Sequence, residues 1–487
     1  MASVRRALVL SMAERYLLIA LGLASNILLA RLLTPEEIGL YSVSIALIGI
    51  AQVLREFGIG NFLIQVKTLT DDHIRTAFGF SLAIGITLFL AIFLVAPFAG
   101  TFYNDERVVE TIRISALNFL VLPFCSISLS LLRRDMKFKK LVAVTLIATT
   151  LGTASTISLA YMGYGANSMA IGALVTNIAT GVGTWFVRGD FRLMLPSFIA
   201  WKELLSFGAR TSAANVITTI SMDINDLAIG RILGFAPVAM ISRAQGLMNL
   251  FHRDLMTAVR NVLYPAFSRA HREGADLEAQ HVFTVASITV LAWPFYAFAA
   301  LHSLELLRLL FGPQWDAAAT LVPWFCLAGA VASTYNMVIP LLTARGRIDL
   351  ATRIDLVTQP IRAVLLVSAV LIFENMLAFA ITFALIFIAS GPYIYLIKGK
   401  CQPTDFRALL IVLRSSLIVT LACMALPTAI LFLTPTKALI GDFPTLFLSA
   451  LICATSWLFA TIWTNHPIAK DPLFIKLLST LKLRAIR

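Results

Sequence analysis

The stretch GFSLAIGITLFLAIFLVAPFAG, residues 79–100, contains no charged side chain. About 20 apolar residues in helical form span the hydrocarbon core of a bilayer. Runs of similar length recur along the whole 487-residue chain. Strands of a membrane barrel would instead give short segments of alternating polarity. The pattern therefore predicts an all-α integral membrane protein.

Composition supports the same class. Hydrophobic residues make up 59% of the chain and charged residues 13%, whereas a soluble domain carries about 25% charged residues. The formal charge is +13, which in a soluble protein would suggest nucleic acid as a partner. In a membrane protein the excess is expected in loops that face the cytoplasm and its anionic leaflet, so no nucleic-acid partner is predicted.

Fourteen transmembrane helices are predicted from the apolar runs. The second and seventh are the most polar of them. The predicted cores are 9–31, 38–56, 76–99, 111–132, 141–162, 166–187, 205–230, 235–257, 282–302, 317–343, 354–373, 376–397, 414–434 and 443–463.

The basic residues predict the orientation of these helices. If the N-terminus is cytoplasmic, 29 of the 39 Lys and Arg residues fall on the cytoplasmic side, 6 on the opposite side and 4 within helices. Cytoplasmic loops of membrane proteins are enriched in Lys and Arg. We therefore expect a multi-pass protein of the bacterial inner membrane with both termini in the cytoplasm.

A short segment recurs about 200 residues apart. Leu29-Ala30-Arg31-Leu32-Leu33 resembles Ile229-Gly230-Arg231-Ile232-Leu233, and each is followed by a second apolar triplet at 38–40 and 238–240. Chance similarity among apolar helices is the alternative explanation. A parallel repeat would give two six-helix lobes with a site between them. The expected domains are 1–203, 204–400 and a C-terminal helix pair with its tail, 401–487.

Motifs for cofactor chemistry are absent from the sequence. There is no G-x-x-x-x-G-K-[ST] phosphate loop and no H-E-x-x-H motif, and the six histidines show no metal-ligand spacing. The five cysteines are scattered. We therefore expect no metal, no cofactor and no enzymatic activity.

Charged residues inside the predicted spans are the candidate functional residues. A charge at the bilayer centre costs roughly 2.5–3.5 kcal/mol on insertion scales, so such residues usually face a cavity or the bundle interior. Arginine suits a phosphate-bearing ligand because its planar fork binds oxyanions in a bidentate manner. The candidate substrate-binding residues are Arg15, Arg55, Arg210, Arg243 and Arg362.

Acidic residues in the spans are candidates for ion coupling, namely Glu14, Asp223, Asp226 and Asp355. Structural roles compete with each function. Arg15 could extend to the membrane surface, and Arg55 could anchor a helix end. Asp223 and Asp226 could cap a helix end or pair with Arg231. Arg362 could form an internal ion pair with Asp355, which lies two turns away on the same face.

Several motifs resemble the polysaccharide transporter family, the Wzx-type branch of the multidrug/oligosaccharidyl-lipid/polysaccharide flippase superfamily. The opening motif is LARLLTPEEIGLY at 29–41, with FGIG at 57–60 and Ile64-Gln65. Further similar stretches are DLAIGRILG at 226–234, YPAFS at 264–268 and LFGPQW at 310–315.

The resemblance implies a function. Such proteins are expected to move an undecaprenyl-pyrophosphate-linked oligosaccharide from the cytoplasmic to the periplasmic leaflet, for exopolysaccharide, capsule or O-antigen synthesis. It implies cavity arginines on the first, second and eighth helices, where Arg15, Arg55 and Arg243 fall. It also implies an ion gradient or membrane potential as the driving force, and a polymerase and chain-length or export proteins as possible partners.

Three alternatives remain open at this level. A drug/cation antiporter of the same superfamily would have about twelve helices and an acidic cavity. A polymerase or glycosyltransferase would need a sizeable periplasmic loop, and the predicted periplasmic turns are very short. A structural scaffold of an export complex has no sequence feature in its favour.

Overall fold

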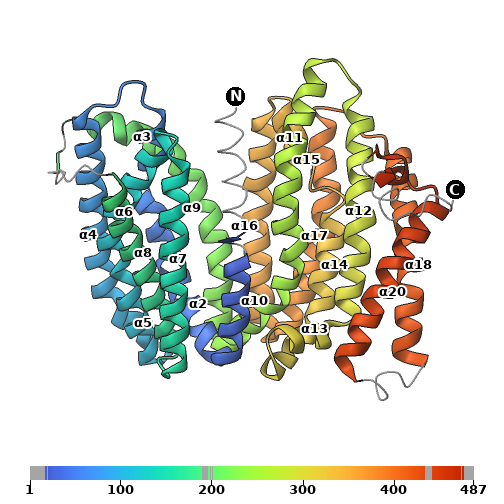
Figure 1. Ribbon diagram of the computed structural model, residues 1–487, viewed down its shortest axis with the longest axis horizontal. Coiled ribbons are helices and arrows are strands. Elements are labelled where there is room, and N and C mark those ends of the chain that lie inside the picture. The colour runs from blue at the N-terminus through green and yellow to red at the C-terminus, as the bar shows by residue number, and fades with distance from the viewer. Residues whose placement is uncertain are drawn as a thin grey trace. The chain divides into compact units, whose positions relative to one another are not determined.

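The computed structural model describes residues 17–188 except 19 and 57, residues 196, 197, 199 and 201–433, and residues 441–475 except 473. Side chains at 50, 188, 205–218, 222, 254, 258, 261, 262 and 433 lie outside this description. The described secondary structure consists of helices alone, which confirms the predicted all-α class (Figure 1). The chain forms two compact units, Met1–Ala239 and Met240–Arg487. The predicted boundaries at 203 and 400 stay predictions.

The described part of the first unit contains a helix at Ala20–Leu32 and eight further helices after it. They are α2 (Pro35–Glu56), α3 (Ile59–Gln65), α4 (Asp71–Tyr103), α5 (Glu106–Ala116), α6 (Asn118–Arg134), α7 (Phe138–Tyr161), α8 (Ala166–Arg188) and α9 (Trp201–Ile232). α2 packs on α9 and α5, α4 packs on α5 and α6, and α8 packs on α6 and α7. The boundary between the units falls within α10 (Phe235–Asn249).

The second unit begins with a π-helical turn. Its elements are η1 (Leu250–Leu255), α11 (Met256–Arg272), α12 (Leu277–Leu301), α13 (Ser303–Leu310), the 3₁₀ helix η2 (Pro313–Thr320), α14 (Val322–Ala332), α15 (Val338–Ala344), α16 (Ile348–Phe373), α17 (Met376–Gly399), α18 (Phe406–Leu433), α20 (Asp442–Trp463) and the 3₁₀ helix η3 (Pro467–Lys470). α12 packs against both α14 and α18, so it forms the core of this unit.

Nine helices in the described part of the chain are long and apolar enough to cross a membrane. The number is eleven if the bent pairs Pro35–Gly49 with Ala51–Gln65 and Pro313–Thr320 with Val322–Ala332 each form one span. Helices also occupy the remaining predicted spans, but Ala20–Leu32 is short, α9 is rich in polar residues and α10 ends at the π-turn. The total of fourteen therefore stays a prediction.

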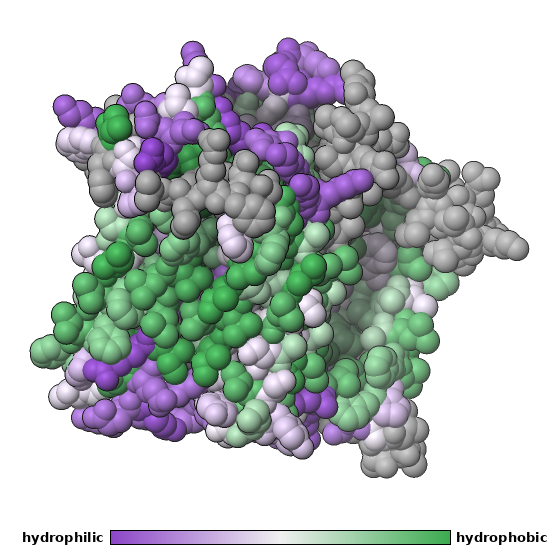
Figure 2. Space-filling model, turned by 60° about the vertical axis from the view of Figure 1, so that its left-hand side comes forward, coloured by the Kyte–Doolittle hydropathy of each residue, from purple (hydrophilic) through white to green (hydrophobic). Residues whose placement is uncertain are grey.

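The outer surface of the first unit is suited to lipid. Figure 2 brings this side forward and shows a hydrophobic band between two polar rims. Large side chains such as Leu94 and Phe98 on α4 are more than 70% exposed. An exposed apolar surface of this extent would be unfavourable in water, and in a bilayer it contacts the hydrocarbon chains. The protein is therefore a multi-span membrane protein.

The TPEE part of the opening motif starts α2. Thr34 Oγ1 accepts a hydrogen bond from the Glu37 backbone N–H at 3.3 Å, and Glu37 Oε2 accepts from the Thr34 N–H at 2.8 Å. This reciprocal arrangement is a capping box, and Pro35 occupies the first helical position, where its missing N–H has no cost. The residue types of the motif thus fix where the helix begins.

The two copies of the repeated segment contact each other. Each ends one helix and precedes the next, because helices end at Leu32 and Ile232 and new helices begin at Pro35 and Phe235. A Cβ on Gly39 of α2 would lie 1.8 Å from the carbonyl oxygen of Phe235. Glycine at position 39 is therefore what allows α2 to approach the start of α10.

Candidate functional site

A polar cavity of about 640 Å³ lies inside the first unit. Residues of α2, α3, α4, α6, α7, α8 and α9 line it. Ligand pockets in proteins commonly measure about 300–1,000 Å³, so this cavity has room for a small polar group. Its lining is unusual for a membrane bundle because it combines arginine, amide and hydroxyl side chains: Arg55, Arg133, Asn61, Asn177, Ser126, Ser130, Thr145, Thr149, Thr176 and Thr180.

The break between α2 and α3 places one wall of this cavity. Gly58 has φ 65°, a left-handed conformation that favours glycine, and it precedes α3 directly. A Cβ on Gly60 would lie 3.0 Å from Ser130 Oγ, so α3 packs closely on α6 there. Arg134 holds the end of α3 by donating to the carbonyl oxygens of Leu63, at 2.7 Å, and Lys67, at 3.3 Å.

Arg55 occupies the last turn of α2 beside the cavity. Its side chain is 9% exposed, and its Nη2 lies 3.3 Å from Oε1 of Glu56, whose side chain is 73% exposed. Arg55 Nε has no hydrogen-bond partner within the described part of the chain. A buried guanidinium with an unused donor in a polar cavity is suited to an oxyanion.

Three threonine hydroxyl groups of the cavity are arranged as acceptors. Thr145, Thr176 and Thr180 each donate to a carbonyl of their own helix at 2.7–2.9 Å. A hydroxyl that has used its one hydrogen in this way keeps lone pairs for an incoming donor. The cavity thus offers acceptors to hydroxyl groups and donors, from arginine, to anions.

The second unit holds a different polar cluster, around two interrupted helices. The π-turn η1 contains His252, and the break between α14 and α15 contains Asn336. Asn336 Nδ2 lies 3.3 Å from His252 Nδ1, so the two interruptions face each other. π-turns occur frequently at functional sites, and substrate sites of transporters are often built from discontinuous helices.

Two arginines lie beside this cluster. Arg260 Nη2 donates to the His252 carbonyl at 3.3 Å, and Arg362 Nη2 donates to Gln359 Oε1 at 2.5 Å. Both positive charges act on His252. Among the described side chains neither guanidinium forms an ion pair. Arg362 therefore bonds Gln359 and not Asp355, which is exposed on α16.

Arg243 lies elsewhere, against the LFGPQW motif. It is 9% exposed, and its guanidinium carbon lies 5.1 Å from the Phe311 ring centre and 5.0 Å from that of Trp315. Cation–π contacts of this kind are stronger when they are desolvated. Arg243 lines neither the cavity of the first unit nor the cluster around His252, and its predicted contact with substrate stays a prediction.

The remaining predicted site residues have varied placements. Glu14 and Arg15 lie outside the described residues, as does the side chain of Arg210. Asp223 packs on α2, where a Cβ on Gly49 would lie 2.0 Å from its Oδ2. Asp223 acts electrostatically on Asp226, and Asp226 acts on Tyr103. Arg231 lies over the Phe102 ring at 5.2 Å and forms no ion pair with either aspartate.

The hydroxyl side chains that line the cavity were not among the predicted site residues, although their spacing in the sequence indicates them. Thr145 and Thr149, and likewise Ser126 and Ser130, are four residues apart on otherwise apolar helices. Residues at i and i+4 lie on one face of a helix. Such pairs mark a polar stripe that the bilayer would not favour on a lipid-facing surface.

A model of the polysaccharide biosynthesis protein family matches residues 28–320. The chain belongs to this family. It is 25% identical over 341 residues to the lipopolysaccharide biosynthesis protein WzxC of Escherichia coli (strain K12), and the match covers 70% of this chain and 69% of that protein. It is 26% identical over 325 residues to the succinoglycan biosynthesis transport protein ExoT of Rhizobium meliloti (strain 1021), covering 66% and 65% respectively.

The fold is that of a known transporter group. A solved structure of the lipid II flippase MurJ in an inward closed conformation superposes with a TM-score of 0.75 and 13% sequence identity. The match covers 94% of this chain and 99% of that one. At this identity the likeness establishes the fold and nothing finer. The resemblance inferred from the sequence motifs is confirmed.

Proposed function

We propose that this protein is a flippase that moves a lipid-linked oligosaccharide repeat unit from the cytoplasmic to the periplasmic leaflet of a bacterial inner membrane. The observation that carries the proposal is the polar cavity of the first unit, in a chain that belongs to the polysaccharide biosynthesis family. The relatives WzxC and ExoT are named for lipopolysaccharide biosynthesis and succinoglycan biosynthesis transport, and MurJ is named as a lipid II flippase.

The chemistry of such a substrate explains the cavity. A hydroxyl moved from water to a solvent that cannot form hydrogen bonds costs roughly 4–8 kcal/mol, so a sugar head group does not cross hydrocarbon unaided. The acceptors Thr145, Thr176 and Thr180 would replace water at sugar hydroxyls. Arg55 would supply donors to a diphosphate oxygen.

The second unit would contribute positive charge of its own. Arg260 and Arg362 belong to helices that flank the π-turn and the α14–α15 break. Buried charges in membranes are retained where they serve transport. We propose that both residues contact the substrate, as we do for Arg55 and for the predicted contacts Arg15, Arg210 and Arg243. Asp223, Asp226, Asp355 and Glu14 remain proposed ion-coupling residues.

The alternative of a drug/cation antiporter fits the cavity less well. An organic cation needs acidic partners, and the lining residues carry two arginines and one glutamate, Glu56, whose side chain is largely exposed. We also favour a carrier over an enzyme. A polymerase would need a large extramembrane region, whereas α7 and α8 are joined by the short turn 162–165 and α16 and α17 by 374–375.

Deletion of the gene tests the function. Surface polysaccharide should disappear while the lipid-linked repeat unit accumulates on the cytoplasmic leaflet of the inner membrane. The leaflet can be assigned with a membrane-impermeant reagent that modifies sugars. A polymerase mutant would instead leave single repeat units facing the periplasm, and that result would overturn the flippase proposal.

The orientation follows from the distribution of basic residues and forms part of the proposal. Both termini, and the loops after 132, 187, 343 and 397, should face the cytoplasm. Reporter fusions at these positions measure the orientation directly. A periplasmic signal from a fusion at Lys139 would show that the orientation is wrong without affecting the assignment of the family.

A further inference from the structure

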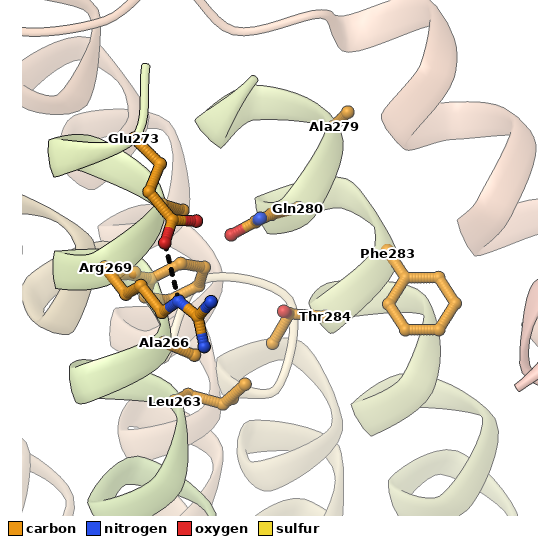
Figure 3. A pocket seen from close by; sticks show the side chains of 10 residues that line it. Leu263, Ala266, Arg269, Glu273, Ala279, Gln280, Phe283 and Thr284 are labelled. Carbon is orange, nitrogen blue, oxygen red and sulfur yellow. Dashed lines mark hydrogen bonds and ion pairs between the residues drawn. The ribbon is translucent and has the colours of Figure 1, made fainter. Parts of the chain in front are cut away.

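An open groove of about 580 Å³ lies between α11 and the first turns of α12 (Figure 3). Its apolar part is formed by Leu263, Phe267 and Phe283. Its polar part is formed by Arg269, Glu273 and Gln280. This groove is separate from the His252 cluster and from the cavity of the first unit.

The groove lies where a transmembrane helix leaves the hydrocarbon. α12 is a candidate span that begins at Leu277, so Gln280 and Phe283 lie in its first two turns. At 1.5 Å per residue this 25-residue span is about 37 Å long, against about 30 Å of hydrocarbon, so Gln280 lies near the hydrocarbon boundary and Phe283 a few ångströms inside it. The Phe283 side chain is 40% exposed, as expected for a residue that borders lipid.

The polarity of the groove changes in one direction along α11. Glu273 is outermost, Arg269 is one turn deeper, and Ala266 and Leu263 are deeper still (Figure 3). On α12 the order runs from Gln280 down to Thr284. From outside to inside, α11 therefore presents an anion, a cation and an apolar wall, while Gln280 of α12 lies level with Glu273 and Thr284 lies level with the Arg269 guanidinium (Figure 3).

A single side-chain contact links the two charged residues. Arg269 Nε donates to Glu273 Oε1 at 2.7 Å. The terminal nitrogens of Arg269 point into the groove in Figure 3. The Arg269 side chain is 74% exposed and that of Glu273 57%, so the pair contributes little to stability and both groups can reach a ligand.

We propose that this groove binds a zwitterionic phospholipid with a primary ammonium head group, of the phosphatidylethanolamine type. The ammonium would bind Glu273 beside Gln280, the phosphate would bind Arg269, the ester region would meet Thr284, and one acyl chain would lie along Leu263, Phe267 and Phe283. The order of ammonium, phosphate and acyl chain in this lipid, from outside to inside, matches the order of Glu273, Arg269 and the apolar wall in the groove. The proposal is independent of the proposed transport function.

Other phospholipids match the groove less well. Phosphatidylglycerol has no cation for Glu273, so that carboxylate would stay unpaired beside the negative phosphate of the lipid. Phosphatidylcholine has a quaternary ammonium without N–H donors, so it cannot form the charge-assisted hydrogen bond that a primary ammonium gives to a carboxylate. Selectivity for the primary ammonium is therefore the diagnostic property.

Native mass spectrometry of the purified full-length protein measures this selectivity. The protein is incubated with an equimolar mixture of the three lipids, and retained lipids are counted at increasing collision energy. We expect phosphatidylethanolamine to be retained about fivefold over phosphatidylcholine, because one charge-assisted hydrogen bond distinguishes them. Glu273→Gln should remove this preference, and Arg269→Gln should lower retention of all three lipids.

Two further variants test the order of charges and the apolar wall. The exchange Arg269→Glu with Glu273→Arg keeps both charges and their i, i+4 spacing but reverses their depth, so the preference should be lost. Ala266→Trp fills the deeper part of the groove and should reduce retention of every lipid. The matched control is the exposed pair Arg347–Asp349, at 2.9 Å; Arg347→Gln and Asp349→Asn should leave the preference unchanged.

Three results would overturn the proposal. The first is equal retention of the three lipids by the wild-type protein. The second is a preference for phosphatidylethanolamine that survives both Glu273→Gln and the charge exchange. The third is stronger retention of an added polyprenyl phosphate that Ala266→Trp abolishes, because the groove would then belong to the transported lipid.

Discussion

The two ends of α2 lie in opposite surroundings within the first unit. Near its start, Gly39 contacts Phe235 so closely that no methyl group fits. In its last turn, Arg55 borders a polar cavity of about 640 Å³. One helix therefore passes from a tightly packed end, where backbones touch, to an open end with unused hydrogen-bonding groups.

The difference shows how a membrane bundle can hold a water-compatible chamber without losing its fold. Apolar side chains gain little from packing against each other rather than against lipid, so close backbone approach at small residues supplies the cohesion. At the packed end Glu36 Oε2 also accepts from the Ala236 N–H at 3.2 Å, and Tyr103 donates to the Leu227 carbonyl at 3.1 Å. The packed end stabilises the unit, and the open end is available for a ligand.

Gly39→Ala should have the largest effect on the packed end. The added Cβ would lie 1.8 Å from a backbone carbonyl that no side-chain rotation can move. We expect the free energy of unfolding to fall by about 3 kcal/mol, at the upper end of overpacking effects, or the protein to fail to fold. The yield of monodisperse protein in detergent measures it. Gly22→Ala is the control, since its Cβ would meet nothing within 4 Å; equal yields for the two variants would contradict the close contact.

Arg55→Ala should affect transport and leave folding intact. Removing a buried partner of a charged ligand costs about 2 kcal/mol, or roughly a 30-fold loss of export activity. Arg55→Lys should restore part of it, because the charge remains without the fork. Surface polysaccharide, normalised to the amount of inserted protein, is the measurement. Lys137→Ala, in an exposed pair with Asp135 at 2.8 Å, is the control. Full export by Arg55→Ala would remove Arg55 from the site.

Arg243→Ala distinguishes packing from substrate contact in the second unit. The guanidinium stacks on Phe311 and Trp315, and a desolvated cation–π contact contributes about 2 kcal/mol. We expect less folded protein, with export per folded molecule reduced less than in Arg55→Ala. Thermal unfolding of the purified variant separates the two effects. If folding is normal and export is lost, Arg243 contacts the substrate, as the sequence predicted.

Glu36→Ala should loosen the packed end by a smaller amount. It removes the carboxylate that accepts from the first turn of α10 and that lies 3.6 Å from Arg107. Loss of a cap of this kind costs about 1 kcal/mol. A shift of the unfolding midpoint reports it, compared with Glu110→Ala, an exposed position on α5. No difference between the two variants would show that the Glu36 contact is dispensable.

The smallest expected effect depends on pH. Asp105 caps α5, and its hydrogen bonds from the Arg107 side chain hold the pKa of its carboxyl below the usual value. Stabilisation is therefore present above about pH 4 and is lost as the pH falls through the lowered pKa. We expect this interaction to contribute less than about 1 kcal/mol to the free energy of unfolding, because Arg107 is mostly exposed. Asp105→Asn should remove this acid dependence of the unfolding midpoint. If the pH profile of the variant equals that of the wild-type protein, Asp105 does not cause the dependence.

Much of the fold follows from local patterns in the sequence. Apolar runs placed the long helices. The predicted second span, 38–56, began inside α2, whose start at Pro35 is set by the capping box of Thr34 and Glu37. The site was harder to predict because it depends on contacts distant in the chain. Arg243 meets rings about 70 positions later, and nothing local indicates this contact.

Arg260 shows most clearly why the positions of some site residues could not be predicted from the sequence. Its position after the predicted span 235–257 suggested a loop cation, one of many on the cytoplasmic side. The structure instead continues the helix through η1 into α11, and Arg260 turns back to the His252 carbonyl. A π-turn has no reliable residue signature. The sequence therefore does not indicate that Arg260 lies beside the cluster around His252.

The π-turn also makes this part of the chain sensitive to length. Each α-helical residue advances the helix by 1.5 Å and about 100°, and a π-turn is equivalent to one residue inserted into that spiral. Removing a single residue such as Leu250 would let the helix close into a regular spiral with the residues beyond it in nearly their present orientation. Inserting a residue there would instead rotate everything beyond it by about 100°. Arg260 would then face a different neighbour, although every side chain of the cluster would still be present. Single-residue deletions and insertions between 250 and 255 are thus a sharper probe of this region than substitutions are.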